Sequence, residues 1–413
     1  MPGALEGFRV LDMSRILAGP WLGQLLADLG AEVWKVERPG SGDDTRQWGP
    51  PYLKDKNDED TSEAAYFLSA NRGKKSICID IRSDEGQELI KKLVGKADIL
   101  IENYKTGDLD RYGLGYEDLQ RINPGLIYCS ITGFGHTGPY RDRAGYDMAI
   151  QAIGGLMGIT GEAADQPGGG PQKVGIPIAD ILTGLYSCVA VLAACHHRNI
   201  TGTGQHVDMA LLDVLVGSLA NQNLNYLTTG VAPKLMGNAH PNIVPYQVFK
   251  TSNGSFILAV GNDGQFQKFC KAADLDELAQ DPRFETNSDR LANRAELVGK
   301  IGAVTGLKTT EAWVELLTAV GVPCAPIQTL DQVFADPQVI DRGMKVSMPH
   351  PLAGEIDLVA NPIKFSNSTI EYDAAPPTLN QHRDYILKEV LQLSKEEYVR
   401  LASGAPVKAD SAA

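Results

Sequence analysis

The feature of this sequence that most constrains its fold is a regular alternation of strand-like and helix-like segments in its first half. A strand-like stretch at 8–14 is followed by a helix-like stretch at 19–30, which has Pro20 in its first turn. A second strand-like stretch follows at 31–37, and the alternation continues as far as the strand-like stretch at 125–134. Because parallel strands must be joined by crossover connections, usually helices, this pattern predicts an α/β fold with a parallel sheet covered by helices.

The pattern changes after about residue 220, which indicates a second domain. A hairpin turning at Asn253 and Gly254 is followed there by helix-like stretches. We therefore predict three segments. Residues 1–224 form the first part of a large domain, 225–334 form a smaller α/β domain, and 335–413 return to the large domain.

Composition argues against several classes of function. The net charge of −13 is unsuited to a surface that binds nucleic acid or anionic membranes. Six cysteines are scattered without a C-x-x-C pair, so neither a zinc site nor a disulfide framework is expected. The longest apolar stretch, Ile181–Cys195, falls short of a bilayer span, and Glu6 stands where a signal peptide would carry positive charge. We expect a cytoplasmic protein without metal, nucleic acid or membrane partners.

The pattern G-x-G-x-x-G at 133–138 suggests a dinucleotide site, but its surroundings do not fit one. Such a site needs a helix that starts at this point and an acidic residue about twenty positions later to bind the ribose. Here Pro139 follows the pattern, and residue 153 is Ile. We therefore do not expect a nicotinamide cofactor.

Asp180 lies where a short strand-like stretch runs directly into a long helix-like one, in the sequence "PQKVGIPIADILTGLYSCVAVLAAC". Aspartate is a favoured helix N-cap, because its carboxylate accepts a hydrogen bond from an unpaired backbone N–H of the first turn. The alternative is that the carboxylate reacts with a substrate. On this stretch alone, the capping interpretation is favoured.

Basic residues gather in the loops that follow the predicted strands. Ligands of open parallel sheets bind at the carboxyl ends of the strands, so these loops suit a nucleotide that carries several phosphates. Any one of these charges could be ordinary solvated surface, but their clustering in an acidic protein favours a binding site. They are Arg15, Arg38, Arg46, Arg72, Lys74, Lys75 and Lys105.

These residues belong to sequence blocks that resemble the class III coenzyme A transferases, the CaiB/BaiF family. The resemblance runs in order along nearly the whole chain and includes "VLDMSRILAGP", "KVERPGSGDDTR", "NRGKKSICID", "LIENYKTGDLDRYGLGYEDL" and "GIPIADILTGLYS". It implies a CoA-transferase fold with a Rossmann-like large domain and a small α/β domain, in an interlaced, ring-like homodimer. It also implies that Asp180 is the catalytic nucleophile, which reverses the preference for capping.

The implied chemistry is covalent catalysis by a carboxylate. Asp180 would attack the donor thioester, the released CoA thiolate would convert the resulting anhydride into an aspartyl-CoA thioester, and an acceptor carboxylate would reverse these steps. Backbone N–H groups at the start of the following helix are candidate donors to the oxyanions. Coenzyme A enters as part of the substrate, and no permanently bound cofactor is expected.

The resemblance also assigns binding residues. In the segment "MGNAHPN", where the chain departs from the formyl-CoA:oxalate branch, His240 and Asn242 are our candidates for contacts with the acceptor carboxylate. The residues that the resemblance places around coenzyme A are Arg15, Leu17, Ala18, Arg38, Arg72, Lys74, Lys75, Asn103, Tyr104, Lys105, Arg111, Arg143, Tyr146 and Asp147.

Two related activities are distinguished by single positions. The α-methylacyl-CoA racemases, our alternative function, use the His of a G-H-D motif as a base; here the motif reads "GYD", and the phenol of Tyr146 is a poor base at neutral pH. The formyl-CoA:oxalate branch has Gln where Leu17 stands. The blocks "GDDTRQWGPP", "RAGYD" and "HPNIVPYQ" are most similar to enzymes that move CoA from succinyl-CoA to dicarboxylates such as glutarate. We therefore expect a class III CoA-transferase with succinyl-CoA as donor and a dicarboxylate as acceptor.

Overall fold

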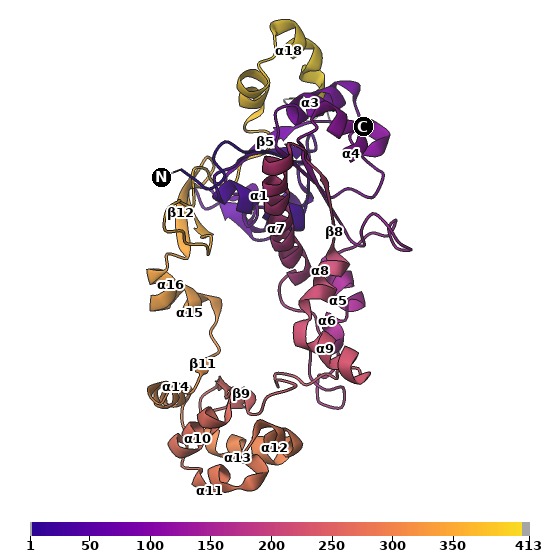
Figure 1. Cartoon of the computed structure of the whole chain (residues 1–413). Helices are drawn as coiled ribbons and strands as arrows, with labels where there is room; N and C mark the ends of the chain where they lie inside the picture. Colours follow the sequence, from indigo (N-terminus) through magenta and orange to yellow (C-terminus); the bar gives the residue numbers. More distant parts are fainter. Residues whose placement is uncertain (1, 407–413) are drawn as a thin grey trace. The chain divides into compact units, whose positions relative to one another are not determined.

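The computed structural model describes residues 2–406, which form two compact units (Figure 1). The segment 157–173, which precedes the Asp180 stretch, groups with the second unit rather than with its neighbours in sequence. The bounds are Met1–Leu156, Val174–Leu224 and Ile340–Ala413 for unit 1, and Met157–Lys173 and Asn225–Val339 for unit 2.

Unit 1 is built on a six-stranded sheet in which all neighbouring strands are parallel. The predicted alternation is therefore confirmed for the first half of the chain. The strands, in their order across the sheet, are β5 (Lys74–Cys78), β2 (Glu32–Glu37), β1 (Arg9–Asp12), β6 (Ile99–Glu102), β7 (Ile127–Thr132) and β8 (His206–Ala210).

Helices cover both faces of this sheet because alternate strand residues point to opposite sides. On β1, Val10 packs into one apolar cluster with residues of α1 and α7, whereas Leu11 packs into a second cluster with residues of α3 and α4. Neither side chain is exposed. The helices of unit 1 around the sheet are α1 (Ala18–Asp28), α3 (Asp84–Val94), α4 (Tyr116–Ile122), α5 (Asp147–Ile153), α7 (Ile178–Thr201) and α8 (Leu211–Ser218).

The strand order reverses between β1 and β6, and this reversal fixes the place of a ligand site. From β1 the chain moves outward to β2 and β5, and it then returns to β6 and moves outward in the other direction to β7 and β8. The loops after β1 and β6 therefore leave the sheet in opposite directions and open a crevice between them.

The last described residues also belong to unit 1 and bond to its N-terminal part. Gly3 N donates to Glu371 Oε1 at 2.8 Å, and Cys78 N donates to Asn380 Oδ1 at 2.7 Å. The additional elements of unit 1 are β3 (Tyr52–Lys54), β4 (Asp60–Ala64), α2 (Ala65–Leu68), β12 (Lys345–His350), β13 (Gly354–Val359), α17 (Arg383–Tyr385) and α18 (Lys395–Leu401).

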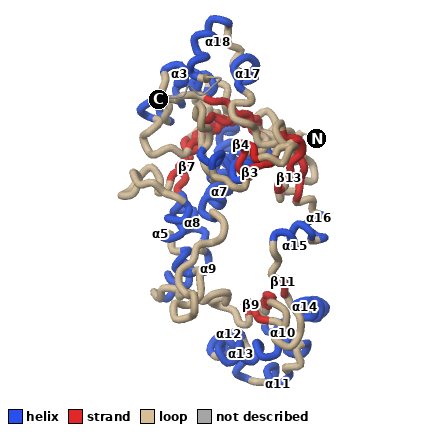
Figure 2. Tube along the Cα trace, turned by 180° about the vertical axis from the view of Figure 1, so that it is seen from behind, coloured by secondary structure: helices blue, strands red, loops and turns tan. Residues whose placement is uncertain are grey.

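Unit 2 is mostly helical, with a small antiparallel sheet in the order β11-β10-β9 (Figure 2). The predicted hairpin is confirmed, since β9 and β10 pair from Lys250 and Ser255 outward. The core contains Phe256, Phe266 and Trp313, none of which is exposed. The elements are β9 (Tyr246–Lys250), β10 (Ser255–Ala259), β11 (Cys324–Pro326), α10 (Asp263–Ala272), α11 (Asp276–Gln280), α12 (Asn287–Ala292), α13 (Arg294–Thr305), α14 (Thr310–Ala319) and α15 (Leu330–Ala335). Three helices span the bounds between the units: α6 (Leu156–Ile159), α9 (Ala220–Thr229) and α16 (Pro337–Asp341).

Helix α7 is longer than the apolar stretch predicted from sequence. It runs for 24 residues, a window of 18 of them has a mean hydropathy of 1.9, and by length and composition alone it could cross a membrane. Its buried residues pack with α1, α8 and the strands of the sheet. This packing is that of a core helix of unit 1.

Candidate active site

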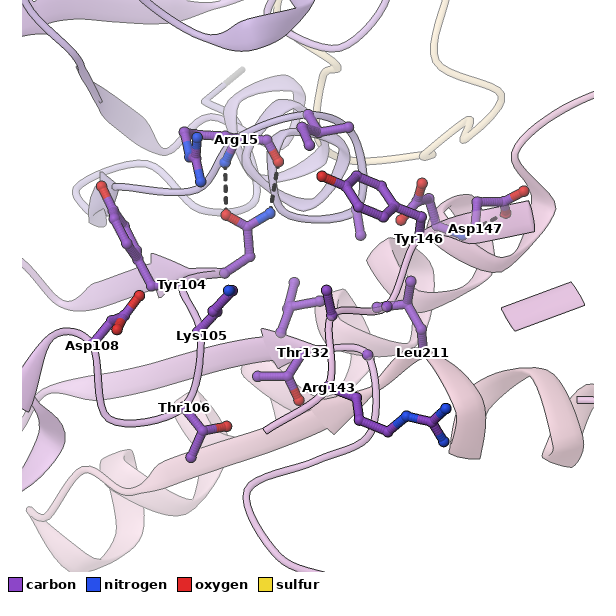
Figure 3. A pocket seen from close by; sticks show the side chains of 18 of the residues that line it. Arg15, Tyr104, Lys105, Thr106, Asp108, Thr132, Arg143, Tyr146, Asp147 and Leu211 are labelled. Atoms are coloured by element: carbon purple, nitrogen blue, oxygen red, sulfur yellow. Dashed lines mark hydrogen bonds between the residues drawn. The ribbon is translucent and has the colours of Figure 1, made fainter. Parts of the chain in front are cut away.

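An open pocket of about 1040 Å³ lies where the strand order of unit 1 reverses. The loops after β1 and β6 form one side of it, and the start of α5 and the start of α7 form the other. Figure 3 shows Arg15, Tyr104 and Lys105 on the first side, facing Tyr146 and Asp147 on the second. These five residues, predicted from separate stretches of sequence, are thus brought together in one pocket.

The turn after β1 is held in a conformation that is unusual for its sequence. Ile16 has a φ of 72°, in the left-handed region that β-branched residues avoid. The Asn103 side chain fixes the neighbouring residue, because its Oδ1 accepts from Arg15 N at 2.9 Å and its Nδ2 donates to Arg15 O at 2.7 Å (dashed lines in Figure 3). Ile16 N donates to Asp43 Oδ1 at 3.2 Å. These bonds give the strained turn its shape and leave the buried Leu17 in the pocket wall.

Asp180 lies on the pocket at the third residue of α7, and it does not cap that helix. The N-cap position is occupied by Pro177, which makes no side-chain bond. Asp147 caps α7 instead, from the start of α5: its Oδ1 accepts from Ala179 N at 2.8 Å and from Asp180 N at 3.4 Å. The capping interpretation of Asp180 is therefore wrong. The N–H groups of Ala179 and Asp180, at the helix start where oxyanion donors were expected, are thus engaged by the Asp147 carboxylate.

The Asp180 carboxyl is poised to exchange a proton near neutral pH. Burial, reinforced by the nearby charge of Asp147, raises its pKa to about 7. Tyr66 faces the same pair, and burial together with the charges of Asp180 and Asp147 raises its pKa to about 12. Tyr66 stacks edge-on against Trp48, with ring centroids 5.0 Å apart. Sequence analysis missed Tyr66, because nothing in the pattern of 65–68 distinguishes it from an ordinary apolar helix residue.

Arg15 lies where the first pocket meets a second one of about 920 Å³. Its Nη1 is 2.7 Å from Asp44 Oδ2, and its guanidinium lies 5.6 Å from the centre of the Tyr104 ring. Arg15, Tyr104 and Asp108 line both pockets. A long ligand can therefore extend from one pocket into the other past Arg15.

Three more arginines line the second pocket beside Arg15, together with Lys35 and the carboxylates of Glu37, Asp43, Asp80 and Asp108. Arg38, Arg82 and Arg111 have side chains that are 50%, 74% and 67% exposed, and all three line the pocket. Arg82 was not singled out from the sequence, although it lies after β5 as Arg15, Arg38 and Lys105 lie after β1, β2 and β6. Ion pairs with Asp44, Asp80 and Asp108 orient the three guanidinium groups.

Three of the basic residues predicted to hold phosphate groups, Arg46, Arg72 and Lys74, are buried in unit 1, and Arg46 pairs there with Glu37 and Glu63. The Lys74 ammonium, which has no exposed surface, bonds to Asp12 Oδ2 at 2.9 Å, Pro20 O at 2.8 Å and Asn71 Oδ1 at 2.9 Å. Arg72, which is 4% exposed, makes a two-pronged bond to Asp28. The expectation that Arg72 and Lys74 contact coenzyme A is thereby corrected, because the Lys74 ammonium and all three guanidinium nitrogens of Arg72 donate to groups within the protein. Lys75 pairs with Glu32 at 3.0 Å and lines neither pocket.

The remaining predicted residues divide between the units. Ala18 and Arg143 line the first pocket, where the Arg143 guanidinium lies 4.5 Å from the centre of the Tyr140 ring. His240 and Asn242 belong to unit 2. There His240 Nδ1 accepts from Asn242 N at 3.1 Å, and burial together with the charge of Arg294 lowers the pKa of this imidazole.

The G-x-G-x-x-G segment lacks the helix of a dinucleotide site, and no metal-binding cluster is found in residues 2–406. No helix begins in the G-x-G-x-x-G segment, and the next helix, α5, starts at Asp147. No group of three or more His, Cys, Asp and Glu side chains in this range is arranged to hold a metal ion.

Comparisons with known proteins agree with this geometry. A family model described as CoA-transferase family III matches residues 5–383. A succinate–glutarate CoA-transferase from Agrobacterium fabrum (strain C58) is 49% identical, and the match covers 94% of this chain and 95% of that protein. A human succinyl-CoA:glutarate CoA-transferase is 42% identical over 98% of this chain and 90% of that protein. The crystal structure of a CaiB/BaiF family protein from Brucella suis is 52% identical, with a TM-score of 0.83, and the match covers 94% of this chain and 100% of that one.

Proposed function

This chain belongs to CoA-transferase family III and is a CoA-transferase, and from that membership we propose that it moves coenzyme A from succinyl-CoA to glutarate or a dicarboxylate of similar length. Two relatives that match nearly the whole chain carry names that specify this donor and this acceptor. The single observation that carries the chemistry is the half-buried Asp180 carboxyl on the pocket, which is free of the capping role.

We propose Asp180 as the nucleophile. Its carboxylate attacks the thioester carbonyl of succinyl-CoA, and the C–S bond breaks to give a succinyl-aspartyl anhydride and CoA thiolate. The thiolate then attacks the Asp180 carbonyl, forms an aspartyl-CoA thioester and expels succinate. Glutarate attacks that thioester, and the same two steps in reverse release glutaryl-CoA and restore the carboxylate. A partly buried site suits these steps, because water would hydrolyse both intermediates.

We propose that the two connected pockets hold coenzyme A in an extended conformation. The thioester end lies in the first pocket beside Asp180, together with Leu17, Ala18, Lys105, Tyr146 and Asp147. The phosphate-bearing end lies in the second pocket, where Arg38, Arg82 and Arg111 supply positive charge that phosphate groups require. This assignment makes the large unit a Rossmann-like coenzyme-binding domain, and no permanently bound cofactor is invoked.

We propose that His240 and Asn242 contact the acceptor. A dicarboxylate has a second, non-reacting carboxylate, and a polar or cationic group that receives it would reject monocarboxylates, because that group would be left unpaired with them. His240 and Arg15 are the two candidates for this group. Replacement of either by Ala should then reduce activity with glutarate more than activity with butyrate.

We propose that the working form is an interlaced, ring-like homodimer in the cytoplasm. The exposed side of α7 supports a second copy, since it presents an apolar stripe that a solvated helix would not carry. Leu185, Tyr186, Val189 and Ile200 on this side are 43%, 50%, 66% and 72% exposed. The cytoplasmic location is supported by the six cysteines, all of which are free thiols.

The racemase alternative is not favoured by this site. The side chain in the position of the racemase base is Tyr146, which is 63% exposed and takes the N-cap position of α5. Such a phenol has neither the basicity nor the enclosure that removal of an α-proton requires.

The test is a transfer assay from succinyl-CoA to a panel of carboxylates, with wild-type protein and the Asp180→Asn variant. We expect glutarate to be used at least 10²-fold better than butyrate, and the Asn variant to retain its fold but lose transfer. Wild-type protein incubated with succinyl-CoA alone should carry coenzyme A on Asp180. Hydroxylamine displaces this coenzyme A and leaves a hydroxamate on Asp180, which is measured by mass spectrometry of the peptides. Transfer by the Asn variant at the wild-type rate would rule out the nucleophile assignment.

A further inference from the structure

The Asp147 carboxylate accepts a hydrogen bond from a buried glutamine side chain. Gln151, on the next turn of α5, has no exposed surface. Its Nε2 donates to Asp147 Oδ2 at 2.6 Å, and its Oε1 accepts from Val174 N at 2.9 Å. Both ends of the amide are therefore used, one on the carboxylate that caps α7 and the other on the segment that leads into α7.

The two oxygens of Asp147 have separate partners, which leaves its carboxylate one orientation. Oδ2 receives the Gln151 amide, and Oδ1 receives the backbone N–H groups of Ala179 and Asp180. Since Pro177 offers no cap of its own, this carboxylate is the cap of α7 within the described residues. The start of α7, and with it Asp180, is thus fixed by a chain of bonds that originates at Gln151.

We propose that Gln151 is a positioning residue for the transfer reaction: its buried amide holds the Asp147 carboxylate beside Asp180, and this fixed negative charge tunes the nucleophile. The inference rests on the proposed function, because it presumes that Asp180 reacts with an acyl-CoA. Gln151 itself lines neither pocket and has no contact with substrate in this scheme.

The fixed charge matters at the anhydride, which the CoA thiolate can attack at either of two carbonyls. Attack at the Asp180 carbonyl expels succinate and moves the reaction forward, whereas attack at the succinyl carbonyl expels the Asp180 carboxylate and restores the donor. The less basic carboxylate leaves faster. By making Asp180 more basic than free succinate, burial and the neighbouring Asp147 charge favour the forward partition.

The test compares the pH profile of succinyl-CoA:glutarate transfer in wild-type protein and in Gln151→Met, which has similar volume and no amide. Asp180 must be ionised to attack, so wild-type kcat/KM should rise with pH to a plateau, with a midpoint near 7. The charged group that faces Asp180 is Asp147, and Tyr66 is the neighbouring titratable group. In the Met variant Asp147 is free to turn away from Asp180, so the midpoint should fall by at least half a pH unit and kcat should fall at least tenfold. The KM for the donor should change less than threefold.

Gln24→Met is the matched control. Gln24 is also a buried glutamine of unit 1, 5% exposed, and its amide bridges Ser69 O and Arg72 N. Its replacement likewise removes one bond donated by the amide nitrogen and one accepted by the amide oxygen, so it should lower thermal stability to a similar degree but leave the midpoint of the pH profile unchanged.

A second variant, Gln151→Glu, keeps the experiment decisive if the Met variant does not fold. Protonated Glu can donate to Asp147 as the amide does, whereas ionised Glu cannot, so its activity relative to wild type should rise as pH falls from 8 to 6. If wild type is active, an unshifted midpoint in Gln151→Met, or a pH-independent activity ratio between Gln151→Glu and wild type, would overturn the inference and leave the proposed function intact. A wild type without transfer to any acceptor would overturn the proposed function itself.

Discussion

Lys74 and Arg82 show how burial separates residues that look equivalent in the sequence. Lys74 is the first residue of β5 and is enclosed with three partners, whereas Arg82 lies in the loop after β5 and is open to the second pocket. Sequence can indicate that a cation follows a strand, but it does not reveal whether the cation faces the core or the solvent.

Replacement of these two residues by Gln should therefore have different effects. Arg82→Gln should raise the KM for succinyl-CoA roughly fivefold to tenfold, more strongly at low salt, with little change in stability. Lys74→Gln leaves the buried Asp12 carboxylate without its ammonium partner and should lower the free energy of unfolding by roughly 3 kcal/mol. Urea titrations and donor saturation curves of the two variants would check this. A large rise in donor KM caused by Lys74→Gln alone, at unchanged stability, would contradict the structural role.

Glu102 is a second carboxyl whose proton is retained near neutral pH. Burial raises its pKa to about 7 from 4.5, although Tyr104 N donates to its Oε2 at 2.8 Å. The folded state thus holds a proton that the unfolded state releases, so the free energy of unfolding should fall as pH rises from about 4.5 through 7.

This loss should be absent in Glu102→Gln. The stability of wild type relative to that variant should decrease by roughly 3 kcal/mol between pH 5 and pH 8.5. Urea unfolding of both proteins across this range measures the difference. Parallel stability curves for the two proteins would show that Glu102 ionises normally.

Among the elements, the turn between β1 and α1 has the backbone conformation that least suits its sequence. Ile16 adopts a left-handed conformation that glycine reaches without strain, and the bonds from Asn103 and Asp43 hold it there. Because the strain belongs to the backbone, it should be visible in the order of stability of small replacements.

Ile16→Gly should be more stable than Ile16→Ala by roughly 1 kcal/mol, the reverse of the usual preference for Ala over Gly. The same pair of changes at Glu88, in the interior of α3, should show the usual order. Thermal melts of the four variants test this. If Ile16→Ala is the more stable of its pair, the turn is not strained.

The elements also show what the sequence could and could not predict. The alternation of apolar stretches was sufficient for the parallel sheet, and strand order then places the pocket between the loops after β1 and β6. Hydrophobic periodicity carries this information because it is local. The cap of α7 by Asp147, 32 residues before Ala179, is not local, and it could not be read from the stretch around Asp180. The position of Tyr66 beside Asp180 depends on the tertiary fold for the same reason.

For the whole molecule, the exposed apolar side of α7 predicts the association state. We expect light scattering to give twice the chain mass of 44.5 kDa, without a folded monomer at nanomolar concentration. Val189→Lys should disrupt this assembly, because it places a charge in the middle of the apolar stripe. The control is Val399→Lys on α18, where an apolar residue that is 78% exposed stands outside this stripe. A stable, active monomer of the wild-type chain would contradict the proposed dimer.

The raised pKa of Asp180 should also couple the binding of ligands to the uptake of protons from the buffer. At pH 7 its carboxyl is protonated in about half of the molecules, so any anionic ligand that approaches it shifts this fraction and draws a proton from the buffer. The heat of binding measured by calorimetry would then differ between phosphate and Tris, which release protons with different enthalpies. The slope of that heat against buffer ionisation enthalpy counts the protons taken up, without any turnover of substrate.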